Sequence, residues 1–147
     1  MKADDKNSTV FHLLGTLDEL NSYIGLVKAR LENEKNKKNA ETIQLNLMKL
    51  MSHVSDSSNP QYFFTESETL ELEKEIERLK KNLPVQNKFI LPGKNETEAF
   101  IHIARTVARR AERYFAAYNK EKKLCPFAAK YINKLSNYLF QLTVNEQ

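Results

Sequence analysis

Cysteine, glycine, proline and tryptophan are scarce in this sequence. Its 147 residues include one cysteine, three glycines, four prolines and no tryptophan. Cys125 alone cannot form an internal disulfide, and it lies in no Cys or His spacing typical of a metal site. This favours a reducing compartment, with the cytoplasm as the default. The few glycines and prolines leave little to interrupt a helix.

Long apolar runs and familiar catalytic motifs are also missing. No run approaches the length that spans a bilayer, and the first residues lack the apolar core of a secretory signal, so we expect a soluble protein with no membrane partner. The absence of a GxxxxGK[ST] loop excludes a Walker-type nucleotidase at motif level. Glu98 and His102 stand four apart rather than in the Glu-x-x-His spacing of di-iron bundles, so we interpret His102 as a packed or partly exposed helix residue and expect no metal site.

Basic residues only slightly outnumber acidic ones. The chain has 23 Lys and Arg against 19 Asp and Glu, a formal net charge of +4. That excess favours an anionic partner such as a nucleotide and falls short of the charge density of a dedicated nucleic-acid binder. The length predicts one domain over residues 1–147.

Apolar residues recur with a spacing near 3.6 and predict five helices packed as an all-α bundle. Thr16 with Glu19, and Thr65 with Glu68, have the spacing of a capping box at a helix start. The charged segment ENEKNKKN after Leu31 is interpreted as a turn. The expected helices cover about 16–31, 40–54, 65 to before Pro84, 95 or 97 to 118, and 126–144.

Arg105, Arg109 and Glu112 form a polar ridge on the fourth of these helices, at spacings of four and three. They lie nearly opposite an apolar ridge of Phe100, Ile103, Val107, Ala111 and Phe115. Periodicity alone favours a solvated face in which Glu112 pairs with Arg109. The alternative is an anion site, because guanidinium groups stay charged and present a fork to phosphate oxygens.

A second polar ridge, Asn133, Ser136 and Asn137, lies on the fifth helix. Short polar side chains lower helix propensity, so three together need a reason. They are either simply exposed or placed to bind a sugar or a base. The aromatic residues Phe63, Phe64 and Phe89 are by default assigned to the core.

Four segments, taken together and in this order, resemble the PduO-type ATP:cob(I)alamin adenosyltransferases of the cobalamin adenosyltransferase family. They are GTLDELNSYIG (15–25), FILPG (89–93), ARTVARRAER (104–113) and YINKLSNYLF (131–140), and the resemblance runs from about Phe11 to Thr143. It implies a ferritin-like five-helix bundle that assembles as a homotrimer, with ATP and corrinoid bound between subunits. The implied enzyme transfers the 5′-deoxyadenosyl group of ATP to the cobalt of cob(I)alamin and releases adenosylcobalamin and triphosphate.

The resemblance also implies roles for the charged residues. Arg109 matches the arginine that contacts the ATP phosphates, with Arg110 and Glu112 as its functional neighbours. Arg105 matches the partner of an aspartate on the adjacent subunit, here Asp18, in a salt bridge that shapes the site.

The remaining implied roles concern the nucleotide and the corrinoid. Asn133 matches a residue that contacts the nucleotide, with Ser136 and Asn137 beside it. Phe89 matches the aromatic residue that packs on the corrinoid and keeps its lower axial ligand from cobalt. Mg²⁺ is the expected companion of ATP. A flavin-dependent reductase and a B12-dependent enzyme are the expected protein partners.

The sequence departs from the family pattern at several positions. The glycine-rich TGDKGTT-like segment that wraps the triphosphate is not found, and only Lys2 and Asp4-Asp5 match the Lys-Asp-Asp that follows it; the segment is either missing from this sequence or lost in this member. His12 replaces a glutamate, Lys94 a glycine and Asn137 an aspartate. These departures bear on ATP affinity and turnover more than on the fold.

Two other functions stay open at this stage. A corrinoid-binding or delivery protein could keep the trimeric bundle while its catalysis is weakened. A basic helical scaffold that contacts nucleic acid is the third, suggested by the net charge and the RRAER segment.

Overall fold

A computed structural model describes residues 3–81, 83 and 89–146, with the backbone alone for residues 3–7. Within them the chain forms five α-helices, one short 3-10 helix and no strand, which confirms the predicted all-α class. The α-helices are α1 (Ala3–Arg30), α2 (Glu34–Ser55), α3 (Glu66–Lys80), α4 (Glu96–Glu121) and α5 (Pro126–Asn145), and the 3-10 helix is η1 (Pro60–Tyr62).

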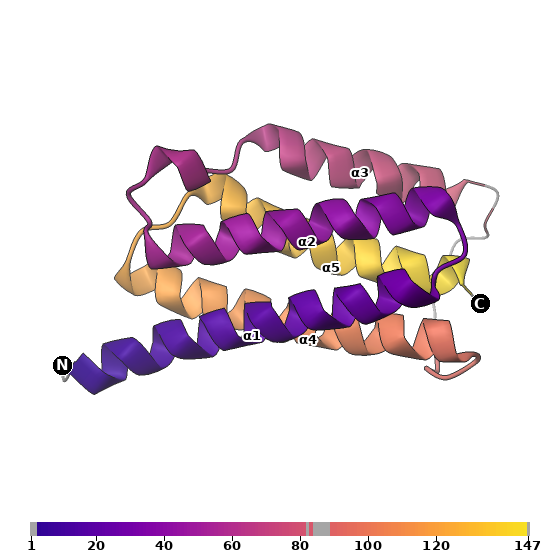
Figure 1. Ribbon diagram of the computed structural model, residues 1–147, viewed down its shortest axis with the longest axis horizontal. Coiled ribbons are helices and arrows are strands. Elements are labelled where there is room, and N and C mark those ends of the chain that lie inside the picture. The colour runs from indigo at the N-terminus through magenta and orange to yellow at the C-terminus, as the bar shows by residue number, and fades with distance from the viewer. Residues whose placement is uncertain (1–2, 82, 84–88, 147) are drawn as a thin grey trace.

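The helices run alternately in opposite directions along one long axis (Figure 1). Helix α1 packs against both α2 and α4, and α5 packs against both α3 and α4. The end of α3 and the start of α4 lie at the same end of the bundle as the α1–α2 turn and the end of α5 (Figure 1). This arrangement places α5 between α3 and α4.

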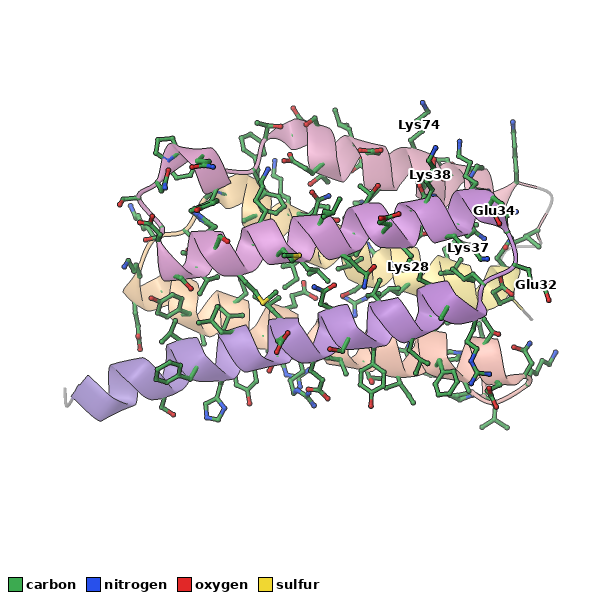
Figure 2. The ribbon with its side chains drawn as sticks, in the orientation of Figure 1. Lys28, Glu32, Glu34, Lys37, Lys38 and Lys74 are labelled. Atoms are coloured by element: carbon green, nitrogen blue, oxygen red, sulfur yellow. The ribbon has the colours of Figure 1, made fainter. Side chains whose placement is uncertain are left out.

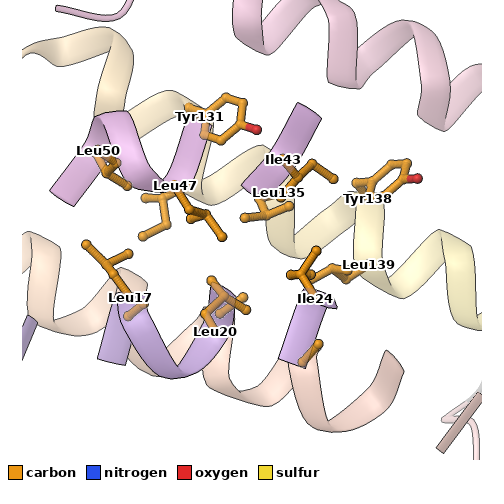
Figure 3. Packing of buried hydrophobic residues seen from close by; sticks show 14 of the residues in the cluster. Leu17, Leu20, Ile24, Ile43, Leu47, Leu50, Tyr131, Leu135, Tyr138 and Leu139 are labelled. Atoms are coloured by element: carbon orange, nitrogen blue, oxygen red, sulfur yellow. The ribbon is translucent and has the colours of Figure 1, made fainter. Parts of the chain in front are cut away.

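The core is built from apolar stripes on all five α-helices. Leucine, isoleucine and tyrosine side chains from α1, α2 and α5 meet at the centre (Figure 3). Complete burial of a side chain of this size stabilises the fold by roughly 1.5–3 kcal/mol. The labelled residues are at most 2% exposed: Leu17, Leu20, Ile24, Ile43, Leu47, Leu50, Tyr131, Leu135, Tyr138 and Leu139.

Helix α1 begins well before the predicted Thr16. The apolar positions Val10 and Leu13 continue its stripe at the helical spacing, so the bundle supports the helix through these residues. The capping box predicted at Thr16 and Glu19 was wrong. Thr16 lies inside the helix, and its hydroxyl donates to the carbonyl of His12 at 2.7 Å.

The predicted turn ENEKNKKN was also wrong, because α2 begins at Glu34. Asn33 caps the helix by accepting a hydrogen bond from the backbone N–H of Asn36 at 3.0 Å. The first turns of α2 then pack against α3: Asn36 accepts from Arg78, and Asn39 donates to Glu75 at 2.7 Å. Figure 2 labels charged side chains near this end of the bundle, of which Lys28 and Lys37 are partly exposed and Glu32, Glu34, Lys38 and Lys74 are exposed.

The other predicted helix starts are confirmed. Thr65 and Glu68 form both hydrogen bonds of a capping box before α3. Asn95 caps α4 by accepting from the N–H of Glu98 at 2.8 Å. Pro126 occupies the first turn of α5, directly after Cys125.

Three aromatic or apolar predictions need correction. Phe64 is buried as expected, but Phe63 is 41% exposed and Phe89 fully exposed. Ile103 was predicted on the apolar ridge of α4 and is 39% exposed. Ala104 and Ala108 instead contribute to the buried face, where their small side chains allow close packing.

The helices that the structure describes do not meet the requirements for crossing a bilayer. Among the described residues, none combines the needed length with a sufficiently apolar composition.

A buried histidine ties α2 to the link between α4 and α5. The Nε2 of His53 accepts a hydrogen bond from the backbone N–H of Cys125 at 2.9 Å, and the side chain is fully buried. Burial lowers the pKa of His53 below its ordinary value of 6.5, and burial lowers the pKa of His102 as well. Both imidazoles are therefore neutral in the folded protein at neutral pH.

We expect the protein to lose stability as the pH falls below about 6.5. When folding lowers the pKa of a histidine, the unfolded chain binds more protons than the folded one. The contribution of that histidine to stability is therefore complete above its pKa in the unfolded chain and is lost as the pH falls toward its pKa in the folded protein. The free energy of unfolding should decrease by up to about 1.4 kcal/mol per pH unit for each of the two histidines. Urea denaturation between about pH 7 and about pH 5 measures this slope.

The His53→Gln variant provides the matched comparison. Glutamine places an oxygen near Nε2 that can accept from Cys125 but does not titrate, so the slope should fall to roughly half. Burial alone would raise the pKa of Glu75, but hydrogen bonds from Arg78 and Asn39 lower it below 4.5. Protonation of this carboxyl therefore affects stability only at more acidic pH than the range measured. Equal slopes for both proteins would show that His53 is not the titrating group.

Candidate active site

A groove of about 760 Å³ runs between α3 and α4, with α5 as its floor. Arg105 and Arg109 of α4 line one wall, and Asn137 of α5 lies between the walls. The other lining residues come mainly from α3 and α5: Glu73, Ile76, Glu77, Lys80, Leu83, Lys134, Phe140 and Gln141. Three of the predicted site residues are thus brought into one concave surface.

Arg109 is held by groups on two helices. Its Nη1 donates to Oε1 of Glu112 at 3.1 Å, and its Nη2 donates to Oδ1 of Asn137 at 3.3 Å. Asn133 donates to the second oxygen of Glu112 at 2.7 Å. The pairing of Glu112 with Arg109 predicted from the sequence is therefore confirmed, and it belongs to a network that joins α4 to α5. These bonds use two of the five guanidinium N–H groups.

The charges in the groove are distributed unequally. On the α3 side the cations have acidic partners, Lys134 with Glu73 at 3.5 Å and Lys80 with Glu77 at 3.9 Å. Arg105 instead donates from Nε to the imidazole Nδ1 of His102 at 3.3 Å. Because that imidazole is neutral, the α4 wall keeps uncompensated positive charge. This wall is suited to bind an anion.

The other predicted site residues lie outside the groove lining. Arg110 pairs with Glu19 of α1 and so connects the RRAER and GTLDEL segments within one chain. Asp18 is exposed on α1, and Phe89 is fully exposed in the FILPG segment. Lys2 lies outside the described residues.

Ser136 does not agree with its predicted role beside Asn133. Its side chain is completely buried, and its hydroxyl has no hydrogen-bond partner in the described part of the chain, whereas Asn133 and Asn137 are exposed. Position 136 faces the core because α5 is packed on two sides, so its side chain is not available to a molecule in the groove.

Two residues of this region were not connected with the site by the sequence analysis, which interpreted His102 as a packed or partly exposed helix residue. Glu98 and His102 extend the polar ridge of Arg105, Arg109 and Glu112 toward the start of α4 at spacings of four and three. Glu98 is fully buried and His102 is 4% exposed. The signal that could have found them is the unbroken spacing of polar residues from 98 to 112.

Metal-ligating side chains do not gather in the described part of the chain. No group of three or more His, Cys, Asp or Glu residues there could hold a metal ion. The polar groups that line the groove are guanidinium, ammonium, amide and carboxylate groups.

Comparison with known proteins gives a consistent result. The corrinoid adenosyltransferase of Bacillus subtilis (strain 168) is 34% identical over 144 residues, which are 92% of this chain and 73% of that protein. Corrinoid adenosyltransferase PduO of Citrobacter freundii is 36% identical over 132 residues, which are 87% of this chain but only 39% of that protein.

A solved structure agrees with these relatives. It is a variant PduO-type ATP:corrinoid adenosyltransferase from Lactobacillus reuteri complexed with cobalamin and ATP. It superimposes with a TM-score of 0.87 at 29% identity, covering 96% of this chain and 81% of that one. The family model described as cobalamin adenosyltransferase matches residues 1–145. The chain therefore belongs to the cobalamin adenosyltransferase family.

Proposed function

We propose that this protein transfers the 5′-deoxyadenosyl group of ATP to the cobalt of a reduced corrinoid, giving adenosylcobalamin and triphosphate. The observation that carries the proposal is the wall of Arg105 and Arg109 in a groove of this family's bundle. The solved relative complexed with cobalamin and ATP supports both substrates.

Arg109 binds the triphosphate of ATP. Glu112 and Asn137 hold its guanidinium from two helices, so the cation is oriented before the substrate arrives. In the reaction, Co(I) supplies an electron pair to the 5′ carbon, a cobalt–carbon bond forms, and the carbon–oxygen bond breaks to release triphosphate. A fixed cation at the departing phosphates stabilises the charge that develops there. No protein nucleophile is needed.

Asn133 and Asn137 form the nucleotide side of the site on α5. Both are exposed and carry amide groups, which can donate and accept hydrogen bonds with a sugar or base. Asn133 is oriented by Glu112 at 2.7 Å. Mg²⁺ travels with the phosphates of ATP, since the described residues offer no acidic cluster to hold it.

Phe89 forms the corrinoid side of the site. Phe89 and Leu91 are 107% and 87% exposed, an unfavourable state for large apolar side chains unless a partner covers them. A corrinoid ring packed on Phe89 would lose its lower axial ligand, and four-coordinate Co(II) is easier to reduce. A flavin-dependent reductase supplies the electron, and a B12-dependent enzyme in the cytoplasm consumes the product.

The site is completed by a second subunit of a homotrimer. Asp18 is exposed on α1, and in the described part of the chain its carboxylate has no cation partner. Arg105 projects into the groove, where its bonded partner is the neutral His102. An ion pair between Asp18 of one subunit and Arg105 of the next gives each of these charges a partner. Glu19 and Arg110 pair inside each chain.

The first test is an anaerobic assay with chemically reduced cob(I)alamin, ATP and Mg²⁺. Spectral conversion to adenosylcobalamin should require both the protein and ATP. The Arg109→Ala variant should reduce kcat/KM by on the order of 100-fold with an unchanged circular dichroism spectrum, because one transition-state contact is lost. Arg113→Ala, an exposed arginine of the same segment, is the matched control and should retain activity.

Two results would contradict this assignment. Full turnover by Arg109→Ala would remove the residue from the site. Corrinoid binding without conversion, together with little heat on titration of ATP, would identify a delivery protein instead of an enzyme.

The shared site makes a second prediction. Asp18→Asn and Arg105→Ala should each lower kcat/KM by roughly tenfold or more, because each leaves a charge unpaired at an interface. Mixing the two variants should restore part of the activity, since some mixed trimers pair a wild-type Asp18 with a wild-type Arg105. Sedimentation analysis should give a trimer; a monomer, or mixtures no better than the separate variants, would refute the shared site.

A further inference from the structure

Glu98 and His102 form a buried polar pair at the start of α4 that the proposed function does not use. Their side chains are 0% and 4% exposed. The atoms that face each other, Oε2 of Glu98 and Nε2 of His102, lie 3.7 Å apart, and neither has a hydrogen-bond partner among the described residues. Buried polar atoms without partners are uncommon, so this pair requires an explanation.

The outer atoms of the pair contact both halves of the proposed site. Oε1 of Glu98 accepts from the backbone N–H of Gly93 at 2.8 Å. Gly93 ends the FILPG segment and has a φ of 108°, a conformation that favours glycine. On the other side, Nδ1 of His102 accepts from Nε of Arg105 at 3.3 Å. The pair therefore connects the segment of Phe89 to the wall of the groove.

The protonation of this connection follows from its surroundings. Burial lowers the pKa of His102, opposed by the carboxylate of Glu98 and assisted by the cation of Arg105. A neutral imidazole that accepts at Nδ1 carries its proton on Nε2, and this N–H faces the Glu98 carboxylate. Glu98 lies in the first turn of α4, where the helix dipole favours an anion.

We propose that Glu98 and His102 are positioning residues that hold Arg105 in the groove and Gly93 in the FILPG segment, and thereby fix the ATP side of the site relative to the corrinoid side. The inference rests on the function proposed above. Arg105 has a long side chain whose ordering costs entropy, and His102 offsets this cost from within the chain before a second subunit or a substrate is bound. An in-line attack of cobalt on carbon depends on such alignment.

Two substitutions at one position separate positioning from packing. In His102→Asn the amide oxygen lies close to Nδ1 and can still accept from Arg105, whereas His102→Gln keeps a donor near Nε2 and loses the Nδ1 acceptor. We expect His102→Gln to raise the KM for ATP by about tenfold and His102→Asn to stay near the wild type, with the KM for cob(I)alamin unchanged in both. Loss of packing alone predicts the opposite order, because asparagine leaves the larger cavity.

A double-mutant cycle tests whether His102 acts through Arg105. In the Arg105→Ala background, His102→Gln should leave the KM for ATP unchanged, because the group that it positions is gone. Independent effects that multiply in the double variant would overturn the proposal.

Two measurements do not depend on turnover. Nitrogen-15 NMR of the imidazole should show the proton of His102 on Nε2, and Glu98→Ala should accelerate exchange of the Gly93 amide hydrogen by about tenfold or more. If the wild type lacks activity, the proposed function fails, and these two measurements alone decide the positioning role. If the wild type is active but the proton lies on Nδ1 and Gly93 exchange is unchanged, the positioning role fails and the function stands.

Discussion

Burial of α5 on most of its surface is the constraint on which the site depends. Half of its 20 residues are buried, because it packs against α3 and α4 and contributes to the central core. Its accessible polar side chains are consequently confined to a narrow stripe that includes Asn133, Lys134 and Asn137. Since α3 and α4 flank this stripe, the same packing that stabilises the bundle also forms the groove.

Helix α4 serves the core and the site at once. Small buried residues such as Ala104, Ala108 and Ala111 let it approach its neighbours closely. The polar ridge on another face changes character along its length, from the buried Glu98 to the partly exposed Arg109 and Glu112. Polar groups near the start of the ridge lie in a low dielectric and position neighbouring residues. Charged groups farther along the ridge are accessible to a ligand.

Local signals in the sequence predicted much of the fold. The caps before α3 and α4 and the proline at the start of α5 depend only on neighbouring residues, so they can be predicted from the sequence. The starts of α1 and α2 depended on distant contacts. Asn36 is polar and suggested a turn, yet Arg78 of α3 satisfies its side chain and supports the helix. Tertiary partners of this kind cannot be read from periodicity.

The site was predictable to a different extent. Spacing placed Arg105, Arg109 and Glu112 on one ridge, and the structure brings Asn137 beside Arg109, which spacing on separate helices cannot show. Ser136 lies three residues after Asn133, a spacing that predicts the same face of α5. The packing of α3 and α4 decides which side of α5 is covered, and it buries Ser136. Glu98 and His102 were named but not connected with the site, because neither the burial of a polar residue nor its partners can be read from spacing.

Asn137, which stands in place of an aspartate of the family pattern, affects both the charge of the site and the support of Arg109. An aspartate there would give Arg109 a second carboxylate partner besides Glu112, and the cluster would carry a net negative charge. With asparagine the charges of Arg109 and Glu112 balance, so more positive potential remains in the groove. The bond from α5 then joins the guanidinium to an uncharged amide oxygen at 3.3 Å instead of to a carboxylate. Glu112 retains the stronger contact, an ion pair at 3.1 Å within the same helix, so the orientation of Arg109 depends chiefly on it. The substitution therefore gives the site a stronger positive field and one looser support for Arg109. In the proposed reaction the leaving group gains negative charge, and a stronger positive field at Arg109 favours that change.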